Sequence, residues 1–199
     1  DTCYIGDTSQ YWACEIRKIQ LIGNNYDKSS NSTITEKSNN SITKSNNSDS
    51  DPNSSKIKIK PQADAAVFDT GTSFLIIPYF DFLNVVSYFL QSAKEKTCAL
   101  TNYMQLMCKC DSPKDFPNFK LNMGTGKVDI NIEDITMYSV DSEFQCQFQI
   151  MTTPNKFFNI WILGDSVLRK LVVEFDMANR SINYASKDDL FKLKNVDDI

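Results

Sequence analysis

The sequence predicts a mainly β fold with a few short helices and one long polar insert. Residues 11–23, "YWACEIRKIQLIG", and residues 56–61, "KIKIKP", alternate apolar and polar side chains. Such alternation is typical of strands with one buried face, because successive side chains of a strand point to opposite faces. Further strand-like runs, separated by turn residues, follow Cys110. With 41% hydrophobic and 12% aromatic residues, the 199-residue chain can fill a core of its own.

We divide the chain into opening strands at residues 1–23, an insert at 24–60 and the main part at 61–199. The insert is mostly Asn, Ser, Lys and Asp. This composition buries too little apolar surface to offset the entropy of ordering, so we expect a disordered loop that the fold tolerates. The alternative is a processing site. Asn-x-Ser/Thr triplets, which are glycan acceptors in secreted proteins but also arise by chance in such a tract, occur at Asn31, Asn39, Asn46, Asn53 and Asn179.

The main part should contain one clear helix and several strands. After Pro78, which suits a helix N-terminus, the apolar residues Phe82, Val85, Val86 and Phe89 share one helical face, and we expect that face to pack on the core. Residues 119–138 indicate strands around a Gly-Thr-Gly turn, and residues 144–152 indicate another strand. Residues 171–185 are typical of a hairpin turning at "MANR".

Composition excludes several classes of function. The net charge of -4 leaves no basic surface for phosphates, so we expect no nucleic-acid partner. The sequence has no apolar run long enough to span a membrane. It opens at Asp1 with polar residues and no signal-peptide pattern, so we expect a mature product or a fragment.

The six cysteines favour disulfides in an oxidising compartment over a metal site. The count is even, the chain has no histidine, and Cys108 and Cys110 are separated by one residue, which is closer than zinc ligands usually lie. We expect no metal and no cofactor. Six cysteines allow many pairings, and their spacing does not choose among them.

A single carboxylate stands out in "AAVFDTGTSFLIIP", residues 65–78. Asp69 lies in an almost wholly apolar run, where an unpaired charge is costly. Two carboxylates that share one proton make such a site useful, because one activates a water molecule while the other donates to the carbonyl under attack. Gly71 allows a tight turn with its N–H near the acid, and Thr70 and Thr72 offer hydroxyls that orient it. The pattern therefore predicts that Asp69 is one half of a catalytic pair.

Three segments in the same order resemble the C-terminal lobe of the bilobal pepsin-like aspartic proteases. "VFDTGTS" at 67–73 resembles the second catalytic motif of this family. "WILGDSVLRKLVVEFDMANRSINYA" resembles its C-terminal end, where the glycine of an apolar-apolar-Gly motif, here Ile162-Leu163-Gly164, lies beside the catalytic loop. "CDSPKDFPNFKLNM" to "QCQFQI" resembles its disulfide loop, and "YW" near residue 11 resembles the strand that opens the lobe. The resemblance covers residues 1–23 and 57–190, and the Asn-rich insert with the extra cysteines looks most like the plasmepsin branch.

This resemblance implies an aspartic endopeptidase whose Asp69 pairs with an aspartate of the N-terminal lobe of the same precursor. Peptide or protein substrates would bind between the lobes, with Thr72, Ser73 and Ile162 lining subsites. The family pattern pairs Cys110 with Cys146, and the short loops favour the pairs Cys3–Cys14 and Cys98–Cys108. The resemblance also implies a zymogen of the secretory pathway, found in an acidic vesicle or outside the cell.

The chain departs from the family pattern in having one Asp-Thr-Gly motif and no segment that resembles the flap with its tyrosine. A non-catalytic pepsin fold that binds a partner is therefore an alternative, although the intact loop argues against it. A symmetric dimer of the retroviral kind is a third hypothesis, but such chains are about half as long and place the glycine motif nearer the aspartate.

Overall fold

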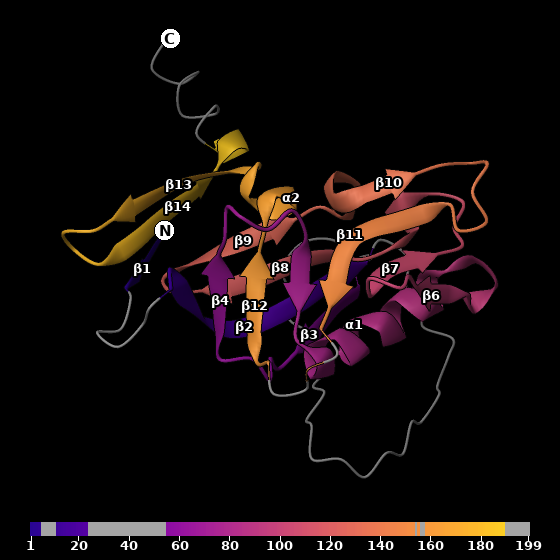
Figure 1. Ribbon diagram of the computed structural model, residues 1–199, viewed down its shortest axis with the longest axis horizontal. Coiled ribbons are helices and arrows are strands. Elements are labelled where there is room, and N and C mark those ends of the chain that lie inside the picture. The colour runs from indigo at the N-terminus through magenta and orange to yellow at the C-terminus, as the bar shows by residue number, and fades with distance from the viewer. Residues whose placement is uncertain (5–10, 24–54, 154, 156–157, 190–199) are drawn as a thin grey trace.

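The computed structural model describes residues 1–4, 11–23, 55–153, 155 and 158–189 of the chain. These residues form an 11-stranded sheet and a 3-stranded sheet, with two α-helices and three short 3₁₀ turns (Figure 1). The predicted mainly β fold with short helices is therefore confirmed. No described helix has the length and apolar character that crossing a membrane requires.

The strands follow one another along the chain with few intervening helices. They are β1 (Thr2–Tyr4), β2 (Ala13–Gly23), β3 (Ser55–Ile59), β4 (Ala65–Phe68), β5 (Leu75–Ile77), β6 (Cys98–Leu100), β7 (Gln105–Cys108), β8 (Asn118–Met123), β9 (Gly126–Ile130), β10 (Thr136–Tyr138), β11 (Cys146–Thr152), β12 (Ile160–Leu163), β13 (Leu171–Asp176) and β14 (Ser181–Ser186). The helices are α1 (Tyr79–Ser92) and α2 (Asp165–Leu168), and the 3₁₀ turns are Lys94–Lys96, Pro113–Asp115 and Ile132–Ile135.

Strand β12 lies at the centre of the large sheet, between two strands that are joined by the loop containing Asp69. It pairs in parallel with β4, where Leu163 is the register partner of Phe68. On its other side it pairs antiparallel with β5, where Leu163 is the partner of Leu75. The chain leaves β4, crosses the end of β12 and returns along β5, which places residues 69–74 directly over the end of β12 (Figure 1).

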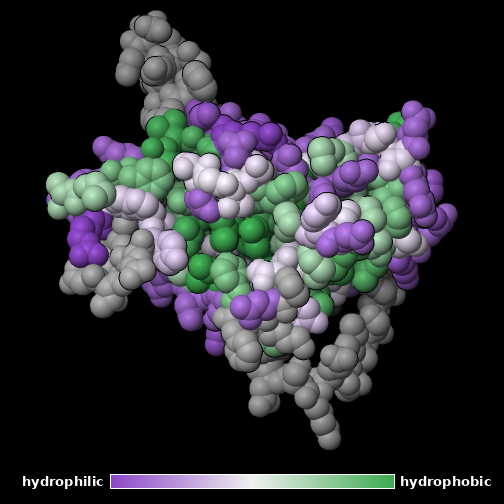
Figure 2. Space-filling model, viewed as in Figure 1, coloured by the Kyte–Doolittle hydropathy of each residue, from purple (hydrophilic) through white to green (hydrophobic). Residues whose placement is uncertain are grey.

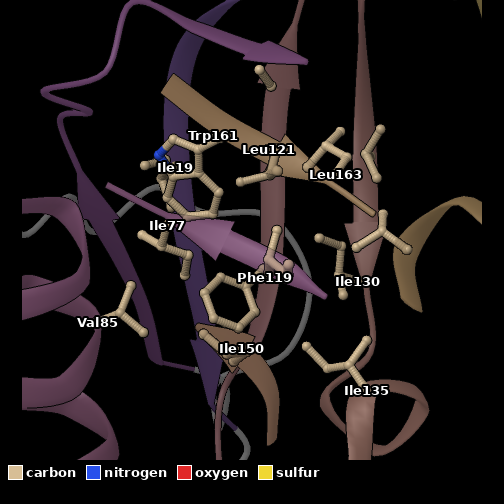
Figure 3. Packing of buried hydrophobic residues seen from close by; sticks show 14 of the residues in the cluster. Ile19, Ile77, Val85, Phe119, Leu121, Ile130, Ile135, Ile150, Trp161 and Leu163 are labelled. Carbon is tan, nitrogen blue, oxygen red and sulfur yellow. The ribbon is translucent and has the colours of Figure 1, made fainter. Parts of the chain in front are cut away.

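The core lies between this sheet and helix α1, and aromatic rings fill much of it. Phe89 is fully buried, with ring centroids 4.9 Å from Phe148 and 5.2 Å from Phe116. The predicted helical face is present: Phe82, Val85 and Phe89 are buried on α1, and the half-buried Val86 packs against the same cluster. Figure 3 shows Val85 facing the strand residues Ile77, Phe119 and Trp161 across this layer.

The predicted hairpin at the C-terminal end is also present. Strands β13 and β14 pair antiparallel from Leu171↔Ser186 to Asp176↔Ser181, with the turn at residues 177–180. Strand β1 completes the small sheet by pairing with β14. The Gly-Thr-Gly turn joins β8 to β9. Gly124 adopts a φ of 51°, and an added Cβ would lie 2.5 Å from the carbonyl oxygen of Thr2, so a side chain would not fit there.

Three disulfides join Cys3 to Cys14, Cys98 to Cys108 and Cys110 to Cys146. The family resemblance implied the third of these pairs, and the short loops favoured the first two. The described part of the chain holds no free cysteine. Cys108 is the register partner of both Cys98 and Cys146, so two of the bridges adjoin at one end of the large sheet. A disulfide of this kind typically contributes about 2–4 kcal/mol of stability.

Residues 24–54, with the triplets at Asn31, Asn39, Asn46 and Asn53, lie outside the described residues. The chain is described again from β3, whose residues 55–59 fall at the end of the segment that we assigned to the insert. Strand β3 pairs with β2, and Ser55 is the register partner of Gly23. Gly23 and Ser55, the described residues on either side of that segment, therefore lie side by side in one hairpin.

Candidate active site

Asp69 lies on the loop between β4 and β5, and neighbouring residues hold both oxygens of its carboxylate. The Gly71 N–H donates to Oδ1 at 2.8 Å, and the Thr72 hydroxyl donates to Oδ2 at 2.6 Å. The backbone N–H of Asp69 donates to the Leu163 carbonyl of β12 at 3.1 Å. The side chain is half-buried, so its remaining lone pairs face an accessible surface.

The local sequence explains this arrangement. Strand β4 is buried from Ala66 to Phe68, and the chain must turn directly after it. A Cβ at Gly71 would lie 3.2 Å from Asp69 Oδ1, which is tighter than ordinary contact. Glycine therefore lets its own N–H approach the carboxylate without pushing it away.

The residues directly after β12 contact the backbone of the same loop. An added Cβ at Gly164 would lie 2.4 Å from the carbonyl oxygens of both Thr72 and Phe74. Directly after it, the Asp165 N–H donates to the Thr72 carbonyl at 2.7 Å and the Ser166 N–H donates to the Ser73 carbonyl at 3.1 Å. The apolar-apolar-Gly motif thus lies in backbone contact with the Asp69 loop.

The structure brings together most, though not all, of the predicted site residues. Thr72 supplies the hydroxyl that orients Asp69, whereas the exposed Thr70 makes no side-chain hydrogen bond to any described residue. The exposed Ser73 lies on the same loop. Ile162 is half-buried on β12, and its place between the buried Trp161 and Leu163 puts it on the opposite face of the sheet from the core.

Ile162 belongs to an apolar surface next to the loop. Its register partners are Val67 on β4 and Ile76 on β5, so the three side chains line one face of adjacent strands. Figure 2 shows hydrophobic residues gathered in the middle of this face, over β4, β12 and β5, with more polar residues around them. This arrangement offers an apolar contact surface beside the carboxylate.

Sequence reasoning missed a second acid, Asp81, in the first turn of α1. Its side chain is completely buried and accepts three hydrogen bonds. Gln62 N–H donates to Oδ1 at 2.8 Å, while Ala63 N–H and the indole Nε1–H of Trp161 donate to Oδ2 at 3.3 Å and 2.8 Å. Acidic residues are common in the exposed first turn of a helix because their charge interacts favourably with the helix dipole. The residue type and position of Asp81 therefore gave no indication that it is buried.

Two ionisable groups outside this loop, Asp176 and Lys94, have pKa values that are shifted by their hydrogen-bond partners. The Asn179 side chain donates to Asp176 at 2.6 Å and, with backbone N–H donors, holds the pKa of that carboxyl below its ordinary value. At the edge of the sheet, the ion pair with Asp111 raises the pKa of Lys94. Within the described residues no group of three side chains could hold a metal ion.

Comparison with known proteins gives a consistent result. The profile of the eukaryotic aspartyl protease family matches residues 7–187. The chain is 28% identical to gastricsin of Oryctolagus cuniculus over 125 residues, and 28% identical to pepsin A of Canis lupus familiaris over 122 residues. These matches cover 61% and 60% of this chain but 29% of each relative, so the chain aligns with under a third of the proteins it resembles. The chain belongs to the eukaryotic aspartyl protease family.

Proposed function

We propose that this chain is the C-terminal half of an aspartic endopeptidase and that Asp69 is one of its two catalytic carboxylates. The observation that carries the proposal is the loop geometry. Both oxygens of Asp69 accept hydrogen bonds, from Gly71 and Thr72, while the half-buried side chain keeps an accessible edge. A carboxylate fixed in this way is prepared to bind one water molecule in a set orientation.

The reaction requires a second carboxylate, which we assign to the N-terminal lobe of the same precursor. The ionised member of the pair takes a proton from the water, and the water oxygen attacks the carbonyl carbon of the peptide bond. The protonated member donates its proton to the carbonyl oxygen. When the tetrahedral intermediate collapses, the C–N bond breaks and the leaving amine takes a proton from the pair. The N–H of Gly71 and the hydroxyl of Thr72 hold Asp69 in place throughout these steps.

The surface beside Asp69 suits an extended peptide with apolar side chains. Thr72 and Ser73 lie on the loop and offer polar groups to a peptide backbone. The half-buried Ile162 and its half-buried register partner Ile76 offer apolar contact next to them, beside the buried Val67. We infer that these residues line substrate subsites on this side of a cleft, and that the other wall of the cleft belongs to the N-terminal lobe.

We also infer that the chain is made in the secretory pathway, because three disulfides form most readily in an oxidising compartment. That it belongs to a zymogen stays a prediction from the family resemblance. The triplet at Asn179 lies in the turn between β13 and β14, where an exposed asparagine is accessible to a glycan. The assignment to the plasmepsin branch stays a prediction that rests on the Asn-rich insert and the extra cysteines.

Substitution of Asp69 by asparagine tests the proposal. Asparagine has nearly the same shape but cannot act as the base or share the proton, so cleavage of denatured globin by the chain assembled with its N-terminal lobe should fall below detection. Asp64→Asn, which makes the same chemical change at an exposed position, is the matched control and should cleave normally. Turnover of Asp69→Asn near the wild-type rate would refute the catalytic assignment and favour a non-catalytic binding protein.

The chain by itself should not cleave peptides, since it supplies one carboxylate. Measuring cleavage across acidic to neutral pH, with and without the N-terminal lobe, tests this point. Activity that appears only with that lobe supports the two-lobed enzyme. Activity of the lone chain that rises with the square of its concentration would instead indicate a symmetric dimer.

A further inference from the structure

Asp81 connects three segments of the chain that are distant in sequence. The carboxylate lies on α1, and its donors lie 18, 19 and 80 residues away, at Ala63, Gln62 and Trp161. Its side chain is completely buried, so these N–H groups are its means of stabilisation in place of water. The oxygens of this side chain accept all three hydrogen bonds, each from an N–H group.

Each of these segments leads directly to the Asp69 loop. Gln62 and Ala63 immediately precede β4, which ends at Phe68 next to Asp69. Helix α1 follows β5, which leaves the loop on its other side. Trp161 lies on β12, two residues before Leu163, whose carbonyl accepts the N–H of Asp69. The Asp81 carboxylate therefore joins the entry to the loop, the exit from it and the strand that supports it.

We propose that Asp81 is a positioning residue for Asp69, acting through the indole of Trp161; the inference rests on the proposed function of Asp69. The hydrogen bond to Oδ2 fixes the position of β12 relative to α1. A shift or rotation of β12 would move the Leu163 carbonyl and Gly164, and both contact the loop. Without this restraint the carboxylate of Asp69 would sample orientations in which it does not face its partner and the water.

The packing around Trp161 shows why the hydrogen bond matters for its position. The ring is fully buried and meets Phe119 edge to face, with centroids 6.5 Å apart. In Figure 3 the indole nitrogen lies on the edge of the ring that faces away from Phe119. Apolar contacts are not directional, so by themselves they allow the flat ring to shift within its plane. The directional hydrogen bond from Trp161 Nε1–H to Asp81 Oδ2, with an N–O distance of 2.8 Å, fixes the position of the ring.

The test compares Asp81→Asn with Trp161→Phe, and uses Asp64→Asn as the matched control on an exposed acid. The asparagine offers one acceptor oxygen, so at least one of the three N–H donors faces an NH₂ group. Trp161→Phe removes a single donor and leaves the carboxylate intact. Three readouts are needed: the indole N–H proton resonance of Trp161, the carboxyl carbon resonance of Asp69, and kcat and KM for denatured globin with the N-terminal lobe present.

We expect Asp81→Asn to move the Trp161 and Asp69 resonances and to lower kcat about tenfold or more, with KM nearly unchanged, because a small displacement of a catalytic group costs rate more than binding. Trp161→Phe should move the Asp69 resonance the same way and lower kcat less. Asp64→Asn should leave all readouts as in the wild type. The two substitutions combined should be less than additive, since both act on the same contact between Asp81 and Trp161.

A folded Asp81→Asn variant with an unchanged Asp69 resonance and unchanged kcat would overturn the inference. Should that variant fail to fold, Trp161→Phe decides by the same criteria, because it keeps the buried carboxylate and two of its donors. A failure of the proposed function gives a different result, namely cleavage that persists in Asp69→Asn. In that case the carboxyl resonance of Asp69, compared between the wild type and Asp81→Asn, still shows whether Asp81 positions Asp69.

Discussion

Replacing Gly164 by alanine tests how tightly β12 packs against the Asp69 loop. The added Cβ would lie 2.4 Å from the carbonyl oxygens of Thr72 and Phe74 and 2.9 Å from the Thr72 carbonyl carbon. These are backbone atoms, which cannot rotate away as the end of a side chain can. Either the loop or the end of β12 must therefore shift.

The cost of that shift can be worked out from the contacts it breaks. Overpacking of this kind costs about 1–3 kcal/mol. The same movement stretches the bonds from Asp165 to Thr72, at 2.7 Å, and from Ser166 to Ser73, at 3.1 Å. Each is worth about 0.5–1.5 kcal/mol, which brings the expected loss of unfolding free energy to about 2–6 kcal/mol. For a chain of this size, a loss of about 3 kcal/mol lowers the melting temperature by roughly 6–12 °C.

Gly71→Ala is the matched control because it adds the same methyl group within the Asp69 loop itself, instead of at the end of β12 that contacts the loop. Its Cβ would lie 3.2 Å from Asp69 Oδ1, a side-chain atom that can turn aside. We expect Gly71→Ala to keep its stability but to displace the carboxylate and lower cleavage, whereas Gly164→Ala loses stability first. Urea denaturation of both variants, followed by cleavage of denatured globin with the N-terminal lobe, separates the two effects. A Gly164→Ala variant as stable as the wild type would refute the packing that we describe.

Two further predictions concern stability. Replacing residues 28–53 with a short Gly/Ser linker should change the melting temperature by only a few degrees. Gly23 and Ser55 are register partners, so closing a short loop between them costs little free energy. A collapse of the soluble yield would contradict this prediction. Asp176 has a pKa lowered by the Asn179 hydrogen bonds, so its contribution to stability is present above its unfolded pKa and is lost as the pH falls through its folded pKa. Asp176→Asn should therefore be less stable than wild type near neutral pH in urea denaturation and converge with it in strong acid, and a difference independent of pH would exclude this linkage.

The sequence predicted those parts of the fold that depend on neighbouring residues. The alternation at residues 13–23 became β2, and the apolar spacing after Pro78 became α1 with Phe82, Val85 and Phe89 buried. Its turn signals also located the β13–β14 hairpin, because turn chemistry is decided within a few residues. The family resemblance alone placed Gly164 beside the Asp69 loop. The position of β12 between β4 and β5 was not predicted, since no local pattern states which strand lies beside which.

The choice between Thr70 and Thr72 shows where local reasoning stops. Both hydroxyls lie close to Asp69 in sequence, and composition gives no reason to prefer one. The path of the backbone decides: the chain turns at Gly71, Thr72 returns beneath the carboxylate and donates to Oδ2 at 2.6 Å, and Thr70 is left exposed on the outside of the turn. The geometry of this turn depends on how β4 and β5, the strands on either side of it, are arranged in the fold, and the local sequence does not reveal that arrangement.

Asp69 and Asp81 lie twelve positions apart in number, in similar apolar surroundings, yet only one could be found from the sequence. The donors to Asp69 lie two and three residues away, so a short motif contains the whole hydrogen-bonded unit. The donors to Asp81 lie 18 to 80 residues away and meet only when β12 and the segment before β4 have packed on α1. The local unit orients the carboxylate that we propose to be catalytic, and the non-local one links α1, β12 and the segment before β4. A buried acid with distant donors is therefore visible only in the fold, although the site depends on both.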